Sequence, residues 1–199
     1  MNFTEYTDQI YKKQLQQRLR YFTKHVLEQE MQCWWFVSFH YNDNHTNKFH
    51  SGLPVGENEL ISDVSYLKRQ LHRSIYKGRD GILKGAGGYP YPRMLFFHEL
   101  SHNGNGQFHT HLILERMPPA LNTYDAMQVL FRKTLPNAVC ALSKKKSVDI
   151  QRICPDNPDY GISNYLTKQS NPSRISLDPF NSDITRGKNE KKSTYHYIP

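Results

Sequence analysis

Histidines and an acidic residue are concentrated in one segment of the chain, FFHELSHNGNGQFHTHLILE, which ends at Glu115. His98 to His102 match the zinc-protease pattern His-Glu-x-x-His, in which two histidines one helical turn apart bind a single zinc ion. His109 and His111 instead match a pair of metal ligands that alternate along a strand. The two patterns require different secondary structures and imply different enzymes.

The helical pattern is disfavoured by the residues around it. Asn103–Gly106 follow directly and are strong turn formers, and the preceding YPYPRMLFF favours an extended chain. The longer zinc-protease pattern HExxHxxGxxH also fails, because Asn105 stands where glycine is required and Phe108 where histidine is required. We therefore do not expect a zinc protease.

The strand pattern has no such conflict. His109 and His111 would point to the same face of a strand, about 7 Å apart, and could bind one divalent ion with a third ligand from the neighbouring strand. A five-residue hairpin loop over residues 102–106 would place Glu99 opposite His109, whereas a two-residue Asn-Gly turn would place His98 there. We favour Glu99 and keep His98 as the alternative. A pair of surface histidines on a hairpin is the simpler explanation of the motif taken alone.

The helices that position these residues are indicated by apolar periodicity. Apolar residues at helical spacing predict helices over residues 6–30 and 57–77. A third helix is predicted over residues 122–136, with Asn122 as its N-cap. The Asn-Pro-Asp sequence indicates the start of a last helix over residues 157–170.

The predicted strands are rich in aromatic and β-branched residues and cover residues 33–42, 93–100, 107–115 and 147–153. After the first helix the order is β-α-β-β-α-β, followed by a helix. This order predicts an α+β fold with a ferredoxin-like or RRM-like core, in which an antiparallel sheet carries its two crossover helices on one face. The other face would be partly free for a ligand.

A chain of 199 residues is long enough for one domain of ordinary size. We expect a single domain over residues 1–199. It would consist of an N-terminal helical part over residues 1–31, a core over residues 33–170, and a basic tail or linker over residues 171–199.

The composition points to an anionic partner inside a cell. The formal net charge is +8, and such a balance is most often associated with nucleic acid. Mean hydropathy is -0.74, and no apolar run approaches the roughly 20 residues of a membrane span. The N-terminus has no apolar secretory signal, and Cys33, Cys140 and Cys154 are too scattered for a disulfide framework. We expect an intracellular protein that does not associate with membranes.

Three motifs occur in a fixed order: an aromatic strand WFVSFHYN, a glycine-rich hairpin with HTH, and NYLTKQ with Tyr165 and Lys168. Together they resemble the HUH endonuclease superfamily, which includes rolling-circle replication initiators and single-tyrosine transposases. The resemblance covers about residues 33–170. One departure is Thr110, which stands between the histidines where a bulky apolar residue is usual.

The resemblance implies a metal-dependent, sequence-specific endonuclease that nicks and rejoins single-stranded DNA at a replication origin or transposon end. Tyr165 would attack the phosphorus, stay joined to the 5′ phosphate and release a 3′ hydroxyl. Lys168 would assist ionisation of the phenol or neutralise phosphate charge, and the metal would be Mn²⁺ or Mg²⁺. Tyr160 is a weaker nucleophile candidate. The compartment would be the cytoplasm in a bacterium or phage, or the nucleus for a eukaryotic virus or transposon.

No Walker A pattern occurs in the sequence, so a helicase would be a further domain or a host protein. Contacts with the DNA are expected from the first strand and from clusters of basic residues. These candidates are Ser38, Phe39, His40, Tyr41, Asn42, Lys68, Arg69, Arg73, Lys77, Arg79, Lys144, Lys145 and Lys146. Which alternating set of the first strand faces DNA is open, and the other set would lie in the core.

Two simpler explanations compete with this interpretation. A run of basic residues is usually only a solvated surface, and a tyrosine followed by a lysine is a common string. The alternative function is a non-catalytic module that binds single-stranded nucleic acid on an RRM-like sheet. The aromatic RNA-binding consensus of that class is absent.

Overall fold

The computed structural model describes residues 3–31, 33–40, 57–76, 92–100, 108–134, 148–154, 156–157, 159, 161–170 and 176–184. Its helices are α1 (Phe3–His25), which continues into a π-helical turn (Val26–Glu30), α3 (Glu57–Tyr76), a 3-10 turn (Pro119–Leu121), α4 (Tyr124–Thr134) and α5 (Ile162–Thr167). Its strands are β1 (Cys33–His40), β2 (Met94–Leu100), β3 (Phe108–Glu115) and β4 (Val148–Arg152).

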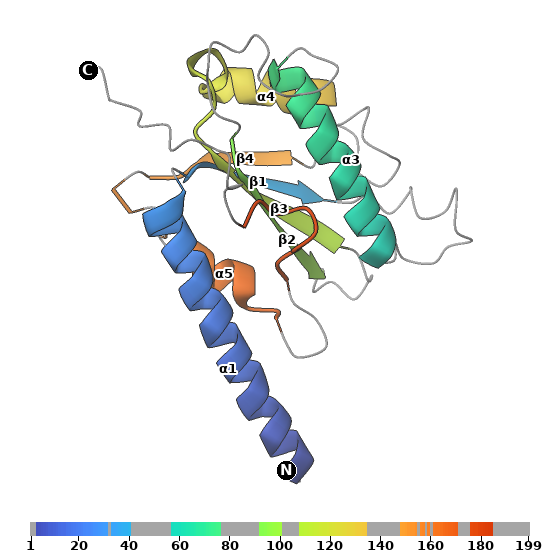
Figure 1. Ribbon diagram of the computed structural model, residues 1–199, viewed down its shortest axis with the longest axis vertical. Helices are drawn as coiled ribbons and strands as arrows, with labels where there is room; N and C mark the ends of the chain where they lie inside the picture. The colour runs from blue at the N-terminus through green and yellow to red at the C-terminus, as the bar shows by residue number, and fades with distance from the viewer. Residues whose placement is uncertain are drawn as a thin grey trace.

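The four strands form one sheet in the order β2-β3-β1-β4, and all three neighbouring pairs are antiparallel. Helices α3 and α4 lie on one side of this sheet, and α1 and α5 lie on the other (Figure 1). The predicted α+β class is therefore confirmed. None of the helices in the described part of the chain is long and apolar enough to cross a membrane.

The larger core lies between the sheet and helices α3 and α4. Trp35, Val37 and Phe39 alternate along β1 and are all at most 1% exposed. They pack against the apolar stripe of α3 that includes Leu60 and Val64, which are four residues apart on one helix face. Complete burial of such a side chain stabilises the fold by about 1.5–3 kcal/mol. This layer therefore contributes to the packing of the sheet against α3 and α4.

A smaller core lies on the opposite face of the sheet. Phe97 and Ile113 point to this face and pack with Leu166 of α5 and with Val26 and Leu27, which follow α1. Phe96 and Leu112, the chain neighbours of Phe97 and Ile113, pack on the opposite face in the larger core. The sheet is therefore covered on both faces along this part of β2 and β3. The second face is therefore not a free binding platform along its whole length.

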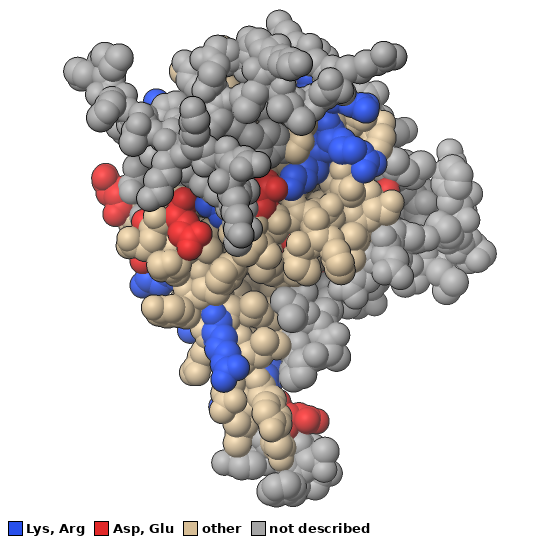
Figure 2. All heavy atoms as spheres, viewed as in Figure 1, with Lys and Arg blue, Asp and Glu red and all other residues tan. Residues whose placement is uncertain are grey.

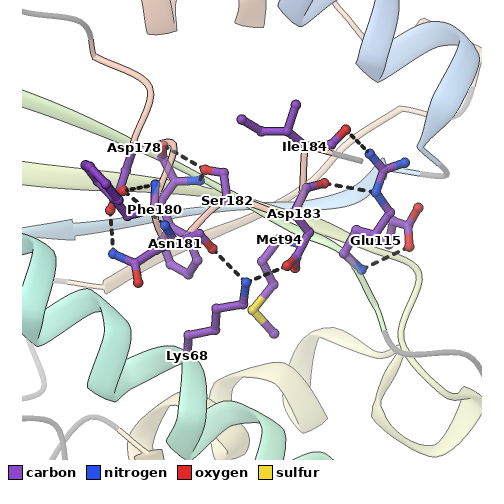
Figure 3. Close-up of polar contacts among 11 residues, drawn as sticks. Lys68, Met94, Glu115, Asp178, Phe180, Asn181, Ser182, Asp183 and Ile184 are labelled. Carbon is purple, nitrogen blue, oxygen red and sulfur yellow. Dashed lines mark hydrogen bonds and ion pairs between the residues drawn. The ribbon is translucent and has the colours of Figure 1, made fainter. Parts of the chain in front are cut away.

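Residues 176–184, which we call the edge segment, run along the outer edge of β2. Backbone N–H groups of His98, Asp178 and Asp183 donate to carbonyls across this edge at 2.7–2.9 Å. Figure 3 shows Lys68 of α3 reaching the Asn181 carbonyl and the Asp183 carboxylate. The prediction of a tail or linker over residues 171–199 is thus wrong for the edge segment, which hydrogen bonds to the outer edge of β2 without forming a fifth strand.

Two helix starts differ from the sequence-based prediction. The hydroxyl of Thr123, rather than Asn122, caps α4 by accepting from Ala126 N at 3.3 Å. Asn122 Oδ1 instead accepts from the indole of Trp35 at 3.0 Å. Helix α5 begins only after Gly161, whose φ of 78° is left-handed and cannot continue a helix. The predicted helix over residues 157–170 is therefore shortened to α5.

Candidate metal and nucleic-acid site

The hairpin register brings an acidic side chain opposite the alternating histidines. Glu99 of β2 pairs directly with His109 of β3, and His111 lies two residues further along the same strand face. One ligand atom from each of these three side chains lies within 4.8 Å of the others. Nε2 of His109 is 3.0 Å from Glu99 Oε2, and Nε2 of His111 is 3.4 Å from the same oxygen. This is the register that a five-residue hairpin loop predicts.

The three side chains, which we call the acidic-histidine cluster, are largely withdrawn from solvent. The side chains of Glu99, His111 and His109 are 0%, 2% and 14% exposed. Glu99 Oε1 and His111 Nε2 have no hydrogen-bond partner among the described residues. Leaving a buried polar atom unsatisfied costs about 1–3 kcal/mol, so these two atoms are suited to bind something further. One carboxylate and two imidazoles are a donor set that fits a divalent cation.

The protonation states in the cluster also suit metal binding. Burial alone would raise the pKa of Glu99, but the hydrogen bond with His109, the close approach of the His111 imidazole and the charge of Lys168 lower it to about 2. Burial lowers the pKa of His111, an effect that the nearby Glu99 carboxylate opposes. Glu99 is therefore ionised and His111 is neutral at neutral pH, as metal ligation requires.

The His111 ring is held from two directions by residues of β1. Ser38, its direct partner across the β1–β3 pair, places its hydroxyl 2.8 Å from His111 Nδ1. Phe36 stacks on the imidazole with ring centroids 5.3 Å apart and an interplanar angle of 13°. When the proton is on Nδ1, it is donated to Ser38 and the Nε2 lone pair is left for a ligand.

Tyr165 and Lys168 of the last helical segment meet this cluster from a third element. Lys168 Nζ lies 3.3 Å from Glu99 Oε2 and 3.5 Å from the centroid of the Tyr165 ring. The centroids of the Tyr165 and His111 rings are 5.1 Å apart, and Tyr165 as a residue is 42% exposed. Buried Leu166 anchors α5 to the sheet, so its neighbour Tyr165 is presented beside the cluster with one side open to solvent.

His98, the alternative third ligand, points to the other face of β2. Its Nδ1 lies 2.9 Å from the Thr110 hydroxyl, and its Nε2 lies 3.1 Å from Asp178 Oδ2. Burial would raise the pKa of Asp178, but hydrogen bonds from His98 and Asn181 lower it. His98 therefore links β2, β3 and the edge segment and does not belong to the acidic-histidine cluster.

Several residues expected to contact DNA have structural roles instead. Phe39 is 1% exposed and packs against Phe131 in the larger core, because it alternates with the site-facing residues of β1. Ser38 is 6% exposed and is engaged with His111. Lys68 is bound to Asn181 and Asp183 in the edge segment. Phe39 thus belongs to the core-facing set of β1, while the proposed DNA contacts of Ser38 and Lys68 stay predictions.

The remaining candidates divide into two groups. Arg69 and Arg73 are exposed on α3, which lies on the opposite side of the sheet from the acidic-histidine cluster. His40 pairs through its backbone with His109. The side chain of His40 is not among those described. The other expected DNA contacts lie outside the described residues: Tyr41, Asn42, Lys77, Arg79, Lys144, Lys145 and Lys146. His102 and Tyr160, which were considered for other roles, also lie outside them.

Two supporting residues were missed as site residues in the sequence. Phe36 belongs to the aromatic strand, and only the observed pairing of β1 with β3 shows that it lies over His111. Gln16 of α1 donates to the carbonyls of Lys168 and Ser170 at 2.7 and 3.0 Å. A contact between residues more than 150 positions apart has no local signal in a sequence.

Comparison with known proteins adds no relative from which a role could be transferred. No protein-family model, no curated protein and no solved structure matches this chain. A functional assignment therefore depends on the chemistry of the residues that the fold brings together.

Proposed function

We propose that this chain is a metal-dependent endonuclease of the HUH type, which cuts and rejoins specific sequences of single-stranded DNA through a tyrosine. One observation carries the proposal: Glu99, His109, His111, Tyr165 and Lys168 converge from β2, β3 and the α5 segment. The sheet order β2-β3-β1-β4 with crossover helices α3 and α4 supports a ferredoxin-like core of the kind that the resemblance implies. Initiation of rolling-circle replication or transposition is the proposed role.

Glu99, His109 and His111 would hold the metal, and their oxygen and nitrogen donors suit Mn²⁺ or Mg²⁺. A divalent cation bound there would act as a Lewis acid that withdraws electron density from a phosphate oxygen. Ser38 and Phe36 fix the orientation of His111, so the cluster needs little reorganisation when a ligand binds.

Tyr165 would act as the nucleophile. Its phenolic oxygen forms a bond to the phosphorus of the strand as the bond from phosphorus to the 3′ oxygen breaks. The phenolic proton leaves to solvent and the departing 3′ oxygen takes up a proton, so a 3′ hydroxyl and a 5′-phosphotyrosine result. Lys168 lies between the phenol ring and Glu99, where its positive charge favours a phosphate in the same space. Attack by a later 3′ hydroxyl reverses the step and rejoins a strand.

A phosphodiester strand fits the charge of the whole chain as well as the site. The formal net charge of +8 favours a polyanion. Tyr165 is partly exposed, so the backbone of a single strand can approach it from solvent. The site then does not need to hold a second, paired strand. An intracellular compartment, cytoplasm or nucleus according to the host, belongs to the same proposal.

The rival function, a non-catalytic single-strand-binding module, has less support. Such a module stacks bases on exposed aromatic side chains of its sheet. Trp35 and Phe39 of β1 are buried under α3 and α4, and Phe36 is half-buried against His111 and Tyr165. Among the strand aromatic residues whose side chains the structure describes, none therefore forms a row of free rings on the sheet.

Adduct formation separates the two functions. The protein would be incubated with end-labelled, sequence-randomised single-stranded DNA and Mn²⁺, and the products would be separated on a denaturing gel. A protein–DNA band that survives boiling, and that is absent with Tyr165→Phe, is expected. Binding without any such band, at every pool length tried, would favour the non-catalytic module.

The ligand set can be tested with neighbouring residues of β2. Glu99→Ala removes the buried carboxylate of the cluster, and we expect a loss of Mn²⁺-dependent cutting of at least about 100-fold. His98→Gln is the matched control, because glutamine can still hydrogen bond to Thr110 and Asp178 on the other face. Equal Mn²⁺ dependence of the two variants would contradict the assignment of Glu99 as a ligand.

A further inference from the structure

Helix α1 carries a row of exposed basic side chains and packs beside the segment with the proposed nucleophile. No acidic residue occurs between Asp8 and Glu28, a stretch that contains Lys12, Lys13, Arg18, Arg20 and Lys24. All five side chains are exposed, and Lys24 alone has an ion-pair partner within the described residues, Glu28 at 3.7 Å. Figure 2 shows Lys and Arg side chains along this helix, part of which extends beyond the sheet in Figure 1.

Three of these cations form a continuous stripe. Lys13, Arg20 and Lys24 are spaced by seven and four residues, which places them on one face of an α-helix. Arg18 points away from this stripe, since two residues along a helix correspond to a rotation of about 200°. Phe22 of α1, together with Val26 of the turn that follows it, is already used in the smaller core.

The stripe is attached to the site through Gln16. This residue donates to the carbonyls of Lys168 and Ser170, at the end of the segment that carries the nucleophile. Lys13 and Arg20 stand three residues before and four residues after Gln16, so both are its neighbours on the helix surface. A strand whose phosphate lies at Tyr165 and Lys168 can therefore continue along α1, where Lys13, Arg20 and Lys24 follow one another.

We propose that the Lys13–Arg20–Lys24 face of α1 binds the phosphodiester backbone of single-stranded DNA next to the cut site. The inference rests on the proposed function for the identity of the anion. From Lys13 to Lys24 an α-helix rises about 16 Å, so this face can follow more than one phosphate of a strand. The contact is electrostatic and independent of sequence, in contrast to recognition of the cut sequence itself.

The test compares two arginines on different faces of the same helix. Binding of labelled oligothymidylate would be measured by fluorescence anisotropy at several KCl concentrations, in a Tyr165→Phe background with EDTA, so that no cutting occurs. Each lost phosphate contact on a single strand lowers the salt slope of log K by about 0.7. Arg20→Gln should lower the slope by about that amount, and Lys13→Gln with Arg20→Gln by about 1.4. Arg18→Gln, the control, should leave the slope unchanged.

Glutamine is a good helix former, so circular dichroism should show the same helix content in all variants. Equal slopes for the Arg18 and Arg20 variants would overturn the inference. So would a loss of binding to phosphatidylcholine–phosphatidylserine vesicles with oligothymidylate binding unchanged, which would mark a membrane-binding face. If the wild type forms the adduct but the Arg18 and Arg20 variants have equal slopes, the proposed function stands and the inference about α1 is wrong. If binding depends on Arg20 but no adduct forms, the proposed function is wrong and the binding face on α1 stands.

Discussion

The chemistry at the residue scale is concentrated on one imidazole. Nδ1 of His111 faces the Ser38 hydroxyl, its ring faces Phe36, and its Nε2 is directed to Glu99 without a hydrogen bond. An imidazole held in this way can offer only one nitrogen to a metal. The same pattern explains why β1 matters to a site whose proposed ligands all lie on β2 and β3.

Ser38→Ala should weaken Mn²⁺ binding without removing a ligand. The hydroxyl fixes the tautomer and orientation of His111, and loss of such a partner typically costs about 10- to 100-fold in metal affinity. Isothermal titration calorimetry with Mn²⁺ measures the effect. Ser38→Thr keeps the hydroxyl and should restore most of the affinity. Wild-type affinity in Ser38→Ala would show that His111 does not depend on this contact.

His72, on α3, should make stability depend on pH away from the site. Burial first, and then the charge of Lys68, lower its pKa from 6.5 to about 3. Below about pH 6.5 the His72 imidazole takes up a proton in the unfolded chain but not in the folded chain. The free energy of unfolding is therefore not reduced by His72 above that pH, and it decreases as the pH falls toward 3. In the wild type, His72 should lower the free energy of unfolding by up to about 2 kcal/mol when the pH is changed from about 7.5 to about 5. In His72→Gln this part of the decrease should be absent. Urea unfolding at the two pH values measures it, and parallel losses in both proteins would refute the assignment.

At the scale of elements, the site depends on how three separate segments are fixed to one another. The β2–β3 register places Glu99 opposite His109. The edge segment hydrogen bonds to the outer side of β2 and so helps to fix the position of that strand. The Ser176 hydroxyl donates to the carbonyl of Leu166, so the edge segment also holds α5. A change in the edge segment should therefore affect the position of Tyr165 relative to the proposed ligands.

Lys68→Met should lower the stability of the fold and leave DNA binding intact. Lys68 is partly buried and ties α3 to the edge segment through Asn181 and Asp183. Loss of these contacts should reduce the free energy of unfolding by about 1–2 kcal/mol, while the methionine keeps the packing of the side-chain stem. Thermal unfolding measures stability, and Arg69→Met is the control because Arg69 is exposed. A lower salt slope for oligothymidylate binding in Lys68→Met alone would restore Lys68 as a DNA contact.

At the scale of the whole molecule, local patterns predicted the elements, while tertiary contacts determined their faces. The aromatic and β-branched residues of β1 predicted a strand, but not that Phe39 would face α4 and Ser38 would face His111. The spacing of His109 and His111 predicted a shared face, and the register of Glu99 depended on a loop length that sequence left open. The edge segment was missed because its hydrogen bonds are to β2, far away in the sequence, and it has no periodicity of its own.

The proposed covalent bond between Tyr165 and a 5′ phosphate can be detected by mass spectrometry. Wild-type protein would react with randomised single-stranded DNA and Mn²⁺, followed by digestion with nuclease and trypsin. We expect a peptide that carries a nucleotide on Tyr165, and we expect this peptide to be absent when Mn²⁺ is replaced by EDTA. Efficient cutting of the DNA with Tyr165 unmodified, or with the nucleotide attached to another residue, would contradict it.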